Sequence, residues 1–246
     1  MNKYEIIKKI EEFAPLDLQE KWDCSGWLVE TEKQEISKVM LALTVTENII
    51  KQAKEQACDM IISHHPLFYI PFPSPLVGEG VRRTGEGLID IYCAHTNLDK
   101  IKGGTTDELI RILGYGDQVI ANESDATQHF VRYIDLKINI IDFIAKLKTI
   151  SPSLRYINNY GVETLNRIAF CSGSGSEFIQ ESFENGADAF VTGDLKFHTA
   201  LESPIVVFDI GHFESEIIVL PVFERIVGSD IEFVYAKETS PFKQTC

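Results

Sequence analysis

The chain has 246 residues, and its 23 Lys and Arg against 37 Asp and Glu give a formal net charge of −14. This length allows one or two domains with a buried core. Such an acidic balance argues against a nucleic-acid surface, which needs clustered basic side chains, and against docking on an anionic membrane. We therefore expect no nucleic-acid partner and no membrane partner.

The first 15 residues predict an amphipathic helix that ends before Pro15. Ile6, Ile7, Ile10 and Phe13 recur at helical intervals between charged residues, and no continuous apolar core of a signal peptide is present. Apolar runs such as residues 217–223 are shorter than the roughly 18 residues of a membrane span. Five cysteines, an odd number without a CxxC pair, indicate reduced thiols and a cytoplasmic protein.

An internal repeat follows. Residues 38–65 and 167–194 align without a gap at a constant offset of 129. Each copy has an apolar run, a polar turn, a helical pattern and then an aspartate, Asp59 or Asp188, before a second apolar run. The pattern predicts two β-α-β units with parallel strands. Pairs of the capping-box form, Thr44 with Glu47 and Ser174 with Glu177, indicate where the two helices begin.

The similarity continues beyond each unit. A further apolar run ends at His95, with Asp99 four residues on, and its counterpart ends near His212, with Glu216 four residues on. The offset here is 117, so the first copy carries 12 extra residues, which we place in the Pro- and Gly-rich loop 68–80. We predict an α/β fold of two similar α/β halves related by this repeat. Because ligands bind at the carboxyl ends of strands in open α/β sheets, we expect a metal site in the cleft between the halves.

The expected division of the chain is a first half over 1–125, which includes the N-terminal helix, a connecting segment over 126–160 and a second half over 161–246. The connecting segment is polar and contains one short helical pattern over 141–150. His129 falls in it, and we interpret this histidine as an ordinary surface or packing residue.

Histidines and carboxylates collect after the apolar runs. They are His64, His65, His95, His198 and His212 with Asp99, Asp194 and Glu216. This mixture is the ligand set of Zn, Mn or Fe, and it exceeds what one ion needs, which favours two metals. Ordinary structural interpretations remain open for each piece: a surface hydrogen bond between His212 and Glu216, a turn cap at Asp194. The Gly-rich segment 172–176 is a weak indication of phosphate binding.

Five motifs in this order resemble a known family. EKWDCSGWLVE, ISHHPLFY, AHTNLDKIKGG, GADAFVTGDLKFH and GHFESE are similar to the signatures of the Nif-three-like family, described as type 2 GTP cyclohydrolase I homologues. The resemblance runs from about Trp22 to about Phe223. It implies two similar α/β halves, a dinuclear metal centre and a toroidal homohexamer.

Carried over motif by motif, the resemblance implies a ligand set for two divalent ions, Zn, Fe or Mn. The ligands would be His64, His65, Asp99, His212 and Glu216, with Glu216 bridging. Asp194 and His198 would line the site and transfer protons, while His95 is left open between supporting the site and packing. Thr44 stands where relatives usually carry Asp, Thr106 and Cys24 replace asparagines, and the inserted central domain of longer members is missing.

The resemblance implies hydrolytic opening of the imidazole ring of GTP to formate and 7,8-dihydroneopterin triphosphate. Water would attack C8, and basic residues would bind the triphosphate. The candidates are Lys100, Lys102, Lys196, Arg82 and Arg83. Two alternatives stay open: a metal-dependent nucleotide phosphohydrolase, and a non-catalytic metal-binding or regulatory scaffold.

Overall fold

The computed structural model describes residues 1–66, 88–120 and 129–243. It contains two units, Met1–Leu98 with Val219–Glu238, and Asp99–Ile218 with Thr239–Cys246. The loop 68–80, where the sequence predicts the extra residues, lies outside the described residues, and so do Arg82 and Arg83.

The first unit is built on a five-stranded sheet of order β1-β4-β3-β2-β11. The strands β2, β3, β4 and β11 are parallel along this order, and β1 pairs with β4 in the antiparallel sense. Its elements are α1 (Lys3–Phe13), η1 (Leu16–Leu18), β1 (Gly26–Val29), β2 (Lys38–Thr44), α2 (Glu47–Glu55), β3 (Met60–His65), β4 (Asp90–Cys93), α3 (Thr96–Lys100), α9 (Leu220–Val227) and β11 (Glu232–Tyr235).

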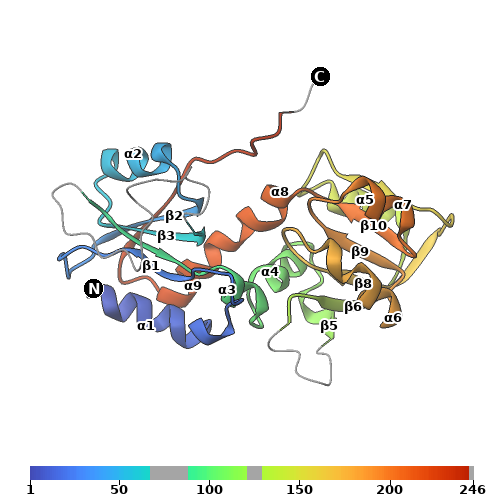
Figure 1. The fold of residues 1–246 in the computed structure, drawn as a ribbon, viewed down its shortest axis with the longest axis horizontal. Helices are drawn as coiled ribbons and strands as arrows, with labels where there is room; N and C mark the ends of the chain where they lie inside the picture. Colours follow the sequence, from blue (N-terminus) through green and yellow to red (C-terminus); the bar gives the residue numbers. More distant parts are fainter. Residues whose placement is uncertain (67–87, 121–128, 244–246) are drawn as a thin grey trace. The chain divides into compact units, whose positions relative to one another are not determined.

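Helices cover both faces of this sheet, with α2 on one side and α1 and α9 on the other (Figure 1). The predicted N-terminal helix is confirmed: the Asn2 side chain accepts from the backbone N–H of Tyr4, and the helix ends at Phe13. Ile6, Ile7 and Ile10 are buried. The apolar stripe read from the sequence is therefore the face that packs toward α9 and the sheet.

The second unit is built on a six-stranded sheet of order β5-β6-β8-β9-β10-β7. Strands β8, β9 and β10 are parallel, while β6 and β7 are antiparallel to their neighbours. Its elements are α4 (Thr105–Ile112), η2 (Gly116–Gln118), β5 (Val119–Ile120), β6 (Arg132–Asn139), α5 (Ile140–Leu147), β7 (Arg155–Ile157), β8 (Thr164–Phe170), η3 (Ser176–Phe178), α6 (Ile179–Glu184), β9 (Ala189–Thr192), α7 (Phe197–Glu202), β10 (Val206–Asp209) and α8 (His212–Glu216), followed by η4 (Ile217–Val219).

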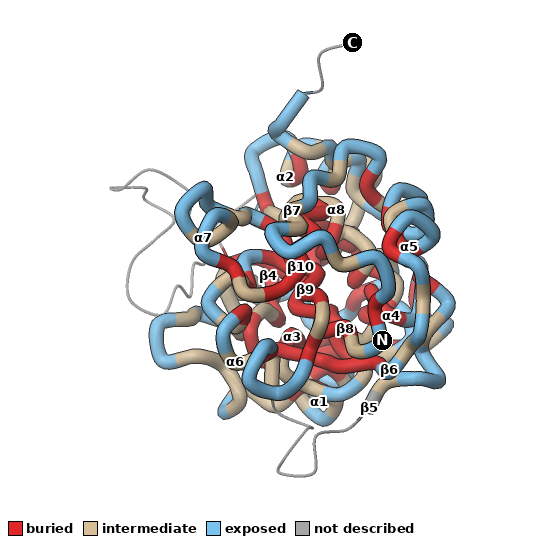
Figure 2. The backbone as a smooth tube through the Cα atoms, turned by 90° about the vertical axis from the view of Figure 1, so that its right-hand side faces the viewer, coloured by how far each residue is buried: buried red, intermediate tan, exposed pale blue. Residues whose placement is uncertain are grey.

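The core of the second unit lies on both faces of its sheet. On one face Ile168 and Phe170 of β8 pack with Phe143 of α5, and on the other Ala169 packs with Ile179 of α6. Alternate residues of one strand thus serve opposite faces, as expected for a sheet covered on both sides. Figure 2 shows the buried residues concentrated in strands such as β8, β9 and β10.

The two units repeat one another in strand register, which confirms the predicted α/β fold with an internal repeat. Met40 pairs with Ile61 in the first sheet, and Ala169 pairs with Phe190 in the second, each 129 residues later. The same offset relates Asp59 to Asp188. Asp59 accepts from the backbone N–H groups of Ser37 and Lys38, and Asp188 accepts from those of Asn166 and Arg167, each 129 residues later.

The third strand refines the predicted insertion. Ser63 pairs with Cys93 and Thr192 with Asp209, so the offset falls from 129 to 116 between these strands. The sheet register therefore gives 13 extra residues to the first copy rather than 12. The difference is Gly211, which has a φ of 85° and has no counterpart before His95.

The boundaries differ from those expected between the halves. Where the structure describes the expected connecting segment, over 129–160, its elements β6, α5 and β7 are parts of the second unit. The helix α5 followed by β7 repeats α1 followed by β1, and Tyr156 pairs with Phe208 as Trp27 pairs with Tyr92. Half of β6 is solvent-facing, with polar Asp135 and Lys137 exposed, which gave the segment its linker-like composition.

Two further differences concern the bounds of the two units and the residues that cap the helices. Residues 99–120 belong to the second unit, and 219–238 return to the first. The cap of α2 is Thr46, whose hydroxyl accepts from Ile49, while Thr44 is the last residue of β2. In the second copy a 3-10 turn precedes α6, which has no side-chain cap.

Candidate metal centre

Three imidazoles gather at the carboxyl end of the first sheet. His64 and His65 are the last residues of β3, and His95 lies between β4 and α3. Their ring centroids are 5.1–5.4 Å apart, and one nitrogen from each ring lies within 4.8 Å of the others. His64 and His65 are buried. Three neutral imidazoles at this spacing fit the nitrogen donor set of Zn, Fe or Mn.

Hydrogen bonds fix the orientation of two of these rings. His64 Nδ1 lies 3.0 Å from the backbone oxygen of Ala94, which can only accept, so Nδ1–H donates. His95 Nδ1 lies 2.9 Å from Oδ1 of Asp23 and donates to that carboxylate. In the neutral rings Nε2 then carries the lone pair. An Nδ1 donor to a carbonyl or carboxylate is the usual support of a metal-ligating histidine.

Asp23 organises the segment around His95. Its carboxylate also accepts from the backbone N–H and the hydroxyl of Thr96, at the start of α3. Burial opposes ionisation, but the bonds from His95 and Thr96 outweigh it and hold the pKa of Asp23 well below its ordinary value. This role of Asp23 was not predictable from the sequence. The motif EKWDCSGWLVE contained the residue, but nothing in it indicated which histidine the carboxylate would meet.

His65 is supported by a different arrangement. Its Nδ1 lies 2.7 Å from the hydroxyl of Thr44, the last residue of β2. The end of β2 is held by Glu238, whose carboxylate accepts from the backbone N–H of Leu43 at 2.6 Å and of Thr44 at 2.9 Å. Burial raises the pKa of Glu238 above its ordinary value against the effect of these bonds.

The second unit presents one imidazole between two carboxylates. His212 opens α8, and its Nε2 lies 2.9 Å from Oε2 of Glu216, one helical turn later. Its Nδ1 lies 2.7 Å from Oδ2 of Asp194. Burial lowers the pKa of His212, but Glu216 and Asp194 outweigh it and raise this pKa to about 9. The helical pairing that the spacing of His212 and Glu216 suggested is confirmed.

The glycine segment 172–176 lies against this group. Gly173 has a φ of +66°, and a Cβ at this position would lie 2.1 Å from Oε1 of Glu216. Its N–H donates to the hydroxyl of Ser215 at 2.9 Å. Only glycine therefore fits beside the Glu216 carboxylate in this geometry.

The remaining predicted residues are placed as follows. Asp99 is buried on α3, four residues after His95. His198 is exposed at the start of α7, with its ring 5.4 Å from that of Phe197. Asp194 has a φ of 55°, which a short polar side chain tolerates, and is 46% exposed.

The candidate phosphate-binding lysines differ in their surroundings. Lys100 lies over the ring of Phe130 at 5.1 Å, and Lys102 and Lys196 are exposed. Thr106 donates to the backbone oxygen of Phe130. Among the described residues, no helix combines the length and the apolar character needed to cross a membrane.

The fold and these groups define a class: an α/β protein with a duplicated β-α-β unit and histidines with carboxylates at the strand ends. Within that class, the model of the family Duf34/NIF3 (NGG1p interacting factor 3) matches residues 1–241. The chain belongs to this family.

Relatives agree with that assignment. A protein of Clostridium perfringens named GTP cyclohydrolase 1 type 2 homolog is 34% identical, over 97% of this chain and 98% of that protein. Among solved structures, reduced HcgD from Methanocaldococcus jannaschii is 28% identical with a TM-score of 0.77, covering 96% of this chain and 97% of its own. A Bacillus cereus protein related to NIF3 has a TM-score of 0.81 at 17% identity, covering 100% and 99%, and shows the fold.

Proposed function

We propose that this protein is a metal-dependent hydrolase that opens the imidazole ring of GTP, releasing formate and 7,8-dihydroneopterin triphosphate. The observation that carries the proposal is the cluster of His64, His65 and His95, whose ring nitrogens lie within 4.8 Å of one another. The Clostridium perfringens relative is named GTP cyclohydrolase 1 type 2 homolog, and this name is the basis for proposing GTP as the substrate.

The proposed cofactor is a pair of divalent ions, Zn, Fe or Mn. The ligands follow the family motifs: His64, His65 and Asp99 with His212 and Glu216. When bound, such ions supply Lewis acidity and a water that ionises near neutral pH. The donor types support the proposal, because imidazole and carboxylate together suit these metals better than Mg or Ca.

The other polar residues would orient ligands and move protons. Asp23 holds His95 through its Nδ1, and Asp194 holds His212 in the same way. Asp194 is also 46% exposed, so its carboxylate is open to exchange a proton with substrate or water. His198 is exposed on the next helix, and we propose it as the alternative proton carrier.

A product assay tests the reaction. Purified protein of measured metal content is incubated with GTP, and formate and the fluorescence of the oxidised pterin are followed. We expect formate from the wild type and none from Glu216→Ala, while His129→Ala behaves as the wild type. Phosphate without formate from protein carrying both metals would show a phosphohydrolase. The absence of both formate and phosphate would indicate a metal-binding or regulatory scaffold.

The proposal includes a toroidal homohexamer in the cytoplasm. The family resemblance supports the assembly, and the free thiols Cys24, Cys58, Cys93 and Cys171 agree with a reducing compartment. Multi-angle light scattering of the metal-loaded protein measures the assembly directly, and a monomer mass would contradict it.

A further inference from the structure

Trp22 is a large apolar side chain held at the surface beside the imidazole cluster. Its side chain is among the exposed large hydrophobics, with 64% of the residue exposed. Its ring centroid lies 6.1 Å from that of His95, and the two rings meet at 74°. Because they meet edge to face, His95 leaves at least one face of the indole uncovered.

The backbone around Trp22 is fixed on both sides. The N–H of Asp23 donates to the backbone oxygen of Glu20 at 2.9 Å, which closes a turn with Trp22 in its centre. The N–H of Glu20 donates to the hydroxyl of Thr96 at 2.9 Å, and Asp23 accepts from Thr96 and from His95. The indole is thus presented by the same bonds that orient His95, so its position is tied to that of the cluster.

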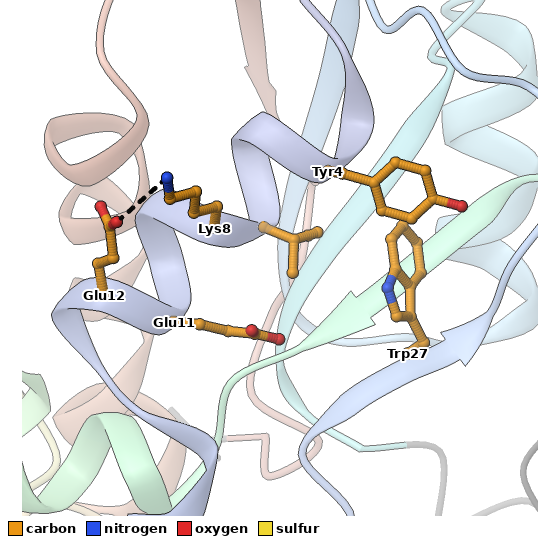
Figure 3. A pocket seen from close by; sticks show the side chains of 6 residues that line it. Tyr4, Lys8, Glu11, Glu12 and Trp27 are labelled. Carbon is orange, nitrogen blue, oxygen red and sulfur yellow. Dashed lines mark ion pairs between the residues drawn. The ribbon is translucent and has the colours of Figure 1, made fainter.

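The other tryptophan of the chain shows the contrast. Trp27 is half-buried on β1, with Tyr92 at 5.5 Å and Tyr4 at 6.3 Å between ring centroids. Its ring also lies 5.1 Å from the ammonium group of Lys3. Figure 3 shows Trp27 beside Tyr4, at the edge of a hollow lined by α1 and β1. Trp27 therefore has a packing role in the unit, whereas Trp22 is 64% exposed and its one ring contact among the described residues is with His95.

We propose that Trp22 is a stacking platform for the planar heteroaromatic ring of the substrate, the purine of a guanine nucleotide. This inference rests on the proposed function and adds the subsite that recognises the base. An exposed, preorganised indole binds a flat π-system through its face and leaves the ring edge free to react. A purine stacked on Trp22 would lie alongside His95, and therefore beside the imidazole cluster.

Fluorescence gives a binding readout that does not depend on turnover. The chain has two tryptophans, so in Trp27→Phe the emission reports Trp22 alone. We expect GTP and guanosine to quench this emission saturably, and inorganic tripolyphosphate to leave it unchanged. Quenching by tripolyphosphate alone, or by none of the three, would overturn the proposal.

Matched variants test the role of the ring. We expect Trp22→Ala to weaken guanosine binding about 10- to 100-fold, as for other stacked bases, and Trp22→Phe to restore most of it. Tyr160→Ala removes another exposed ring, 70% exposed, from the segment between β7 and β8 of the second unit, and should bind guanosine as the wild type does. Wild-type binding by Trp22→Ala with a changed oligomer mass would instead make Trp22 a contact between copies.

The formate assay separates the two proposals. Formate release by Trp22→Ala with an unchanged KM would remove the stacking role and leave the reaction standing. Trp22-dependent guanosine binding without formate would remove the reaction and leave the stacking role. We expect the wild type and Trp22→Ala both to release formate. The KM for GTP should be raised in Trp22→Ala, and kcat should change less.

Discussion

The two units share one arrangement of strands but carry different side chains at the strand ends. Their central strands pair in the same register, and Asp59 and Asp188 fasten equivalent strands through equivalent backbone bonds. At the strand ends the first unit gathers three imidazoles, whereas the second sets His212 between two carboxylates. After duplication the strands conserve packing, while the residues just beyond them are free to take up different chemistry.

The largest expected effect tests the ligands of the second unit. Glu216→Ala should lose metal from both sites, because we propose this carboxylate as the bridge, and affinity should fall by more than about 100-fold. Metal content of the purified protein, measured by mass spectrometry, checks the result. His129→Ala should lose none. Full metal content in Glu216→Ala would remove the ligand assignment.

The second copy of the repeat carries a glycine where the first copy carries the last residue of β2. Gly173 occupies the place of Thr44 in the repeat, and Gly173→Ala would drive a Cβ against Glu216 as well as straining a φ of +66°. We expect a loss of about 1–3 kcal/mol in the free energy of unfolding together with loss of metal. Urea denaturation and metal analysis measure the two effects.

Gly186→Ala is the matched control for that substitution. Gly186 has a φ of +80° with nothing within 4 Å of an added Cβ, so it carries the strain without the clash. It should lose stability and keep its metal. Equal metal loss in both variants would show that strain, rather than displacement of Glu216, is responsible.

Asp23 and Asp194, which accept hydrogen bonds from His95 and His212, should differ in their effects on stability and on metal binding. Asp23→Asn weakens the support of His95 and disturbs bonds to Thr96 within a buried setting, so we expect a loss of about 1–3 kcal/mol. Asp194 is 46% exposed, and Asp194→Asn should change stability little. Metal affinity, from competition with a chelator, should fall about 10- to 100-fold in Asp194→Asn, whose partner His212 is a proposed ligand. The fall should be smaller in Asp23→Asn, whose partner His95 is outside the proposed ligand set. An unchanged affinity in Asp23→Asn would make His95 a packing residue.

The smallest expected effect concerns Asp59, the aspartate whose counterpart in the second copy is Asp188. Burial opposes ionisation of Asp59, but bonds from Lys33, Ser37 and Lys38 outweigh it and lower its pKa to about 2. A depressed pKa contributes stability that is present above the unfolded value near 4 and is lost as pH falls toward 2. Wild type should exceed Asp59→Asn by up to about 2 kcal/mol at pH 7 and converge with it by pH 2. A gap that stays constant on acidification would exclude this carboxylate as its source.

The repeat was visible in the sequence because strands buried on both faces are continuous apolar runs, as in residues 39–43 and 168–171. The copy of α1 and β1 in α5 and β7 was not visible, since β7 has three residues and β6 alternates polar with apolar side chains. The histidines were found from their place after strands. Asp23 and Glu238 were not, because their partners lie 72 and 195 residues away in the sequence and local spacing carries no such information.

The return of the chain to its first unit has a consequence during synthesis. Strand β11 (Glu232–Tyr235) pairs with β2 (Lys38–Thr44), so the first sheet lacks its edge strand until residues 232–235 leave the ribosome. At typical translation rates that interval is roughly 10 to 40 s. Over it the apolar strand β2 presents unpaired backbone groups, whereas the sheet of the second unit comes from one uninterrupted stretch. The second unit can thus complete its sheet before the first unit does. The N-terminal unit, with β2 still unpaired, is therefore the part of the nascent chain where binding of a chaperone would matter most.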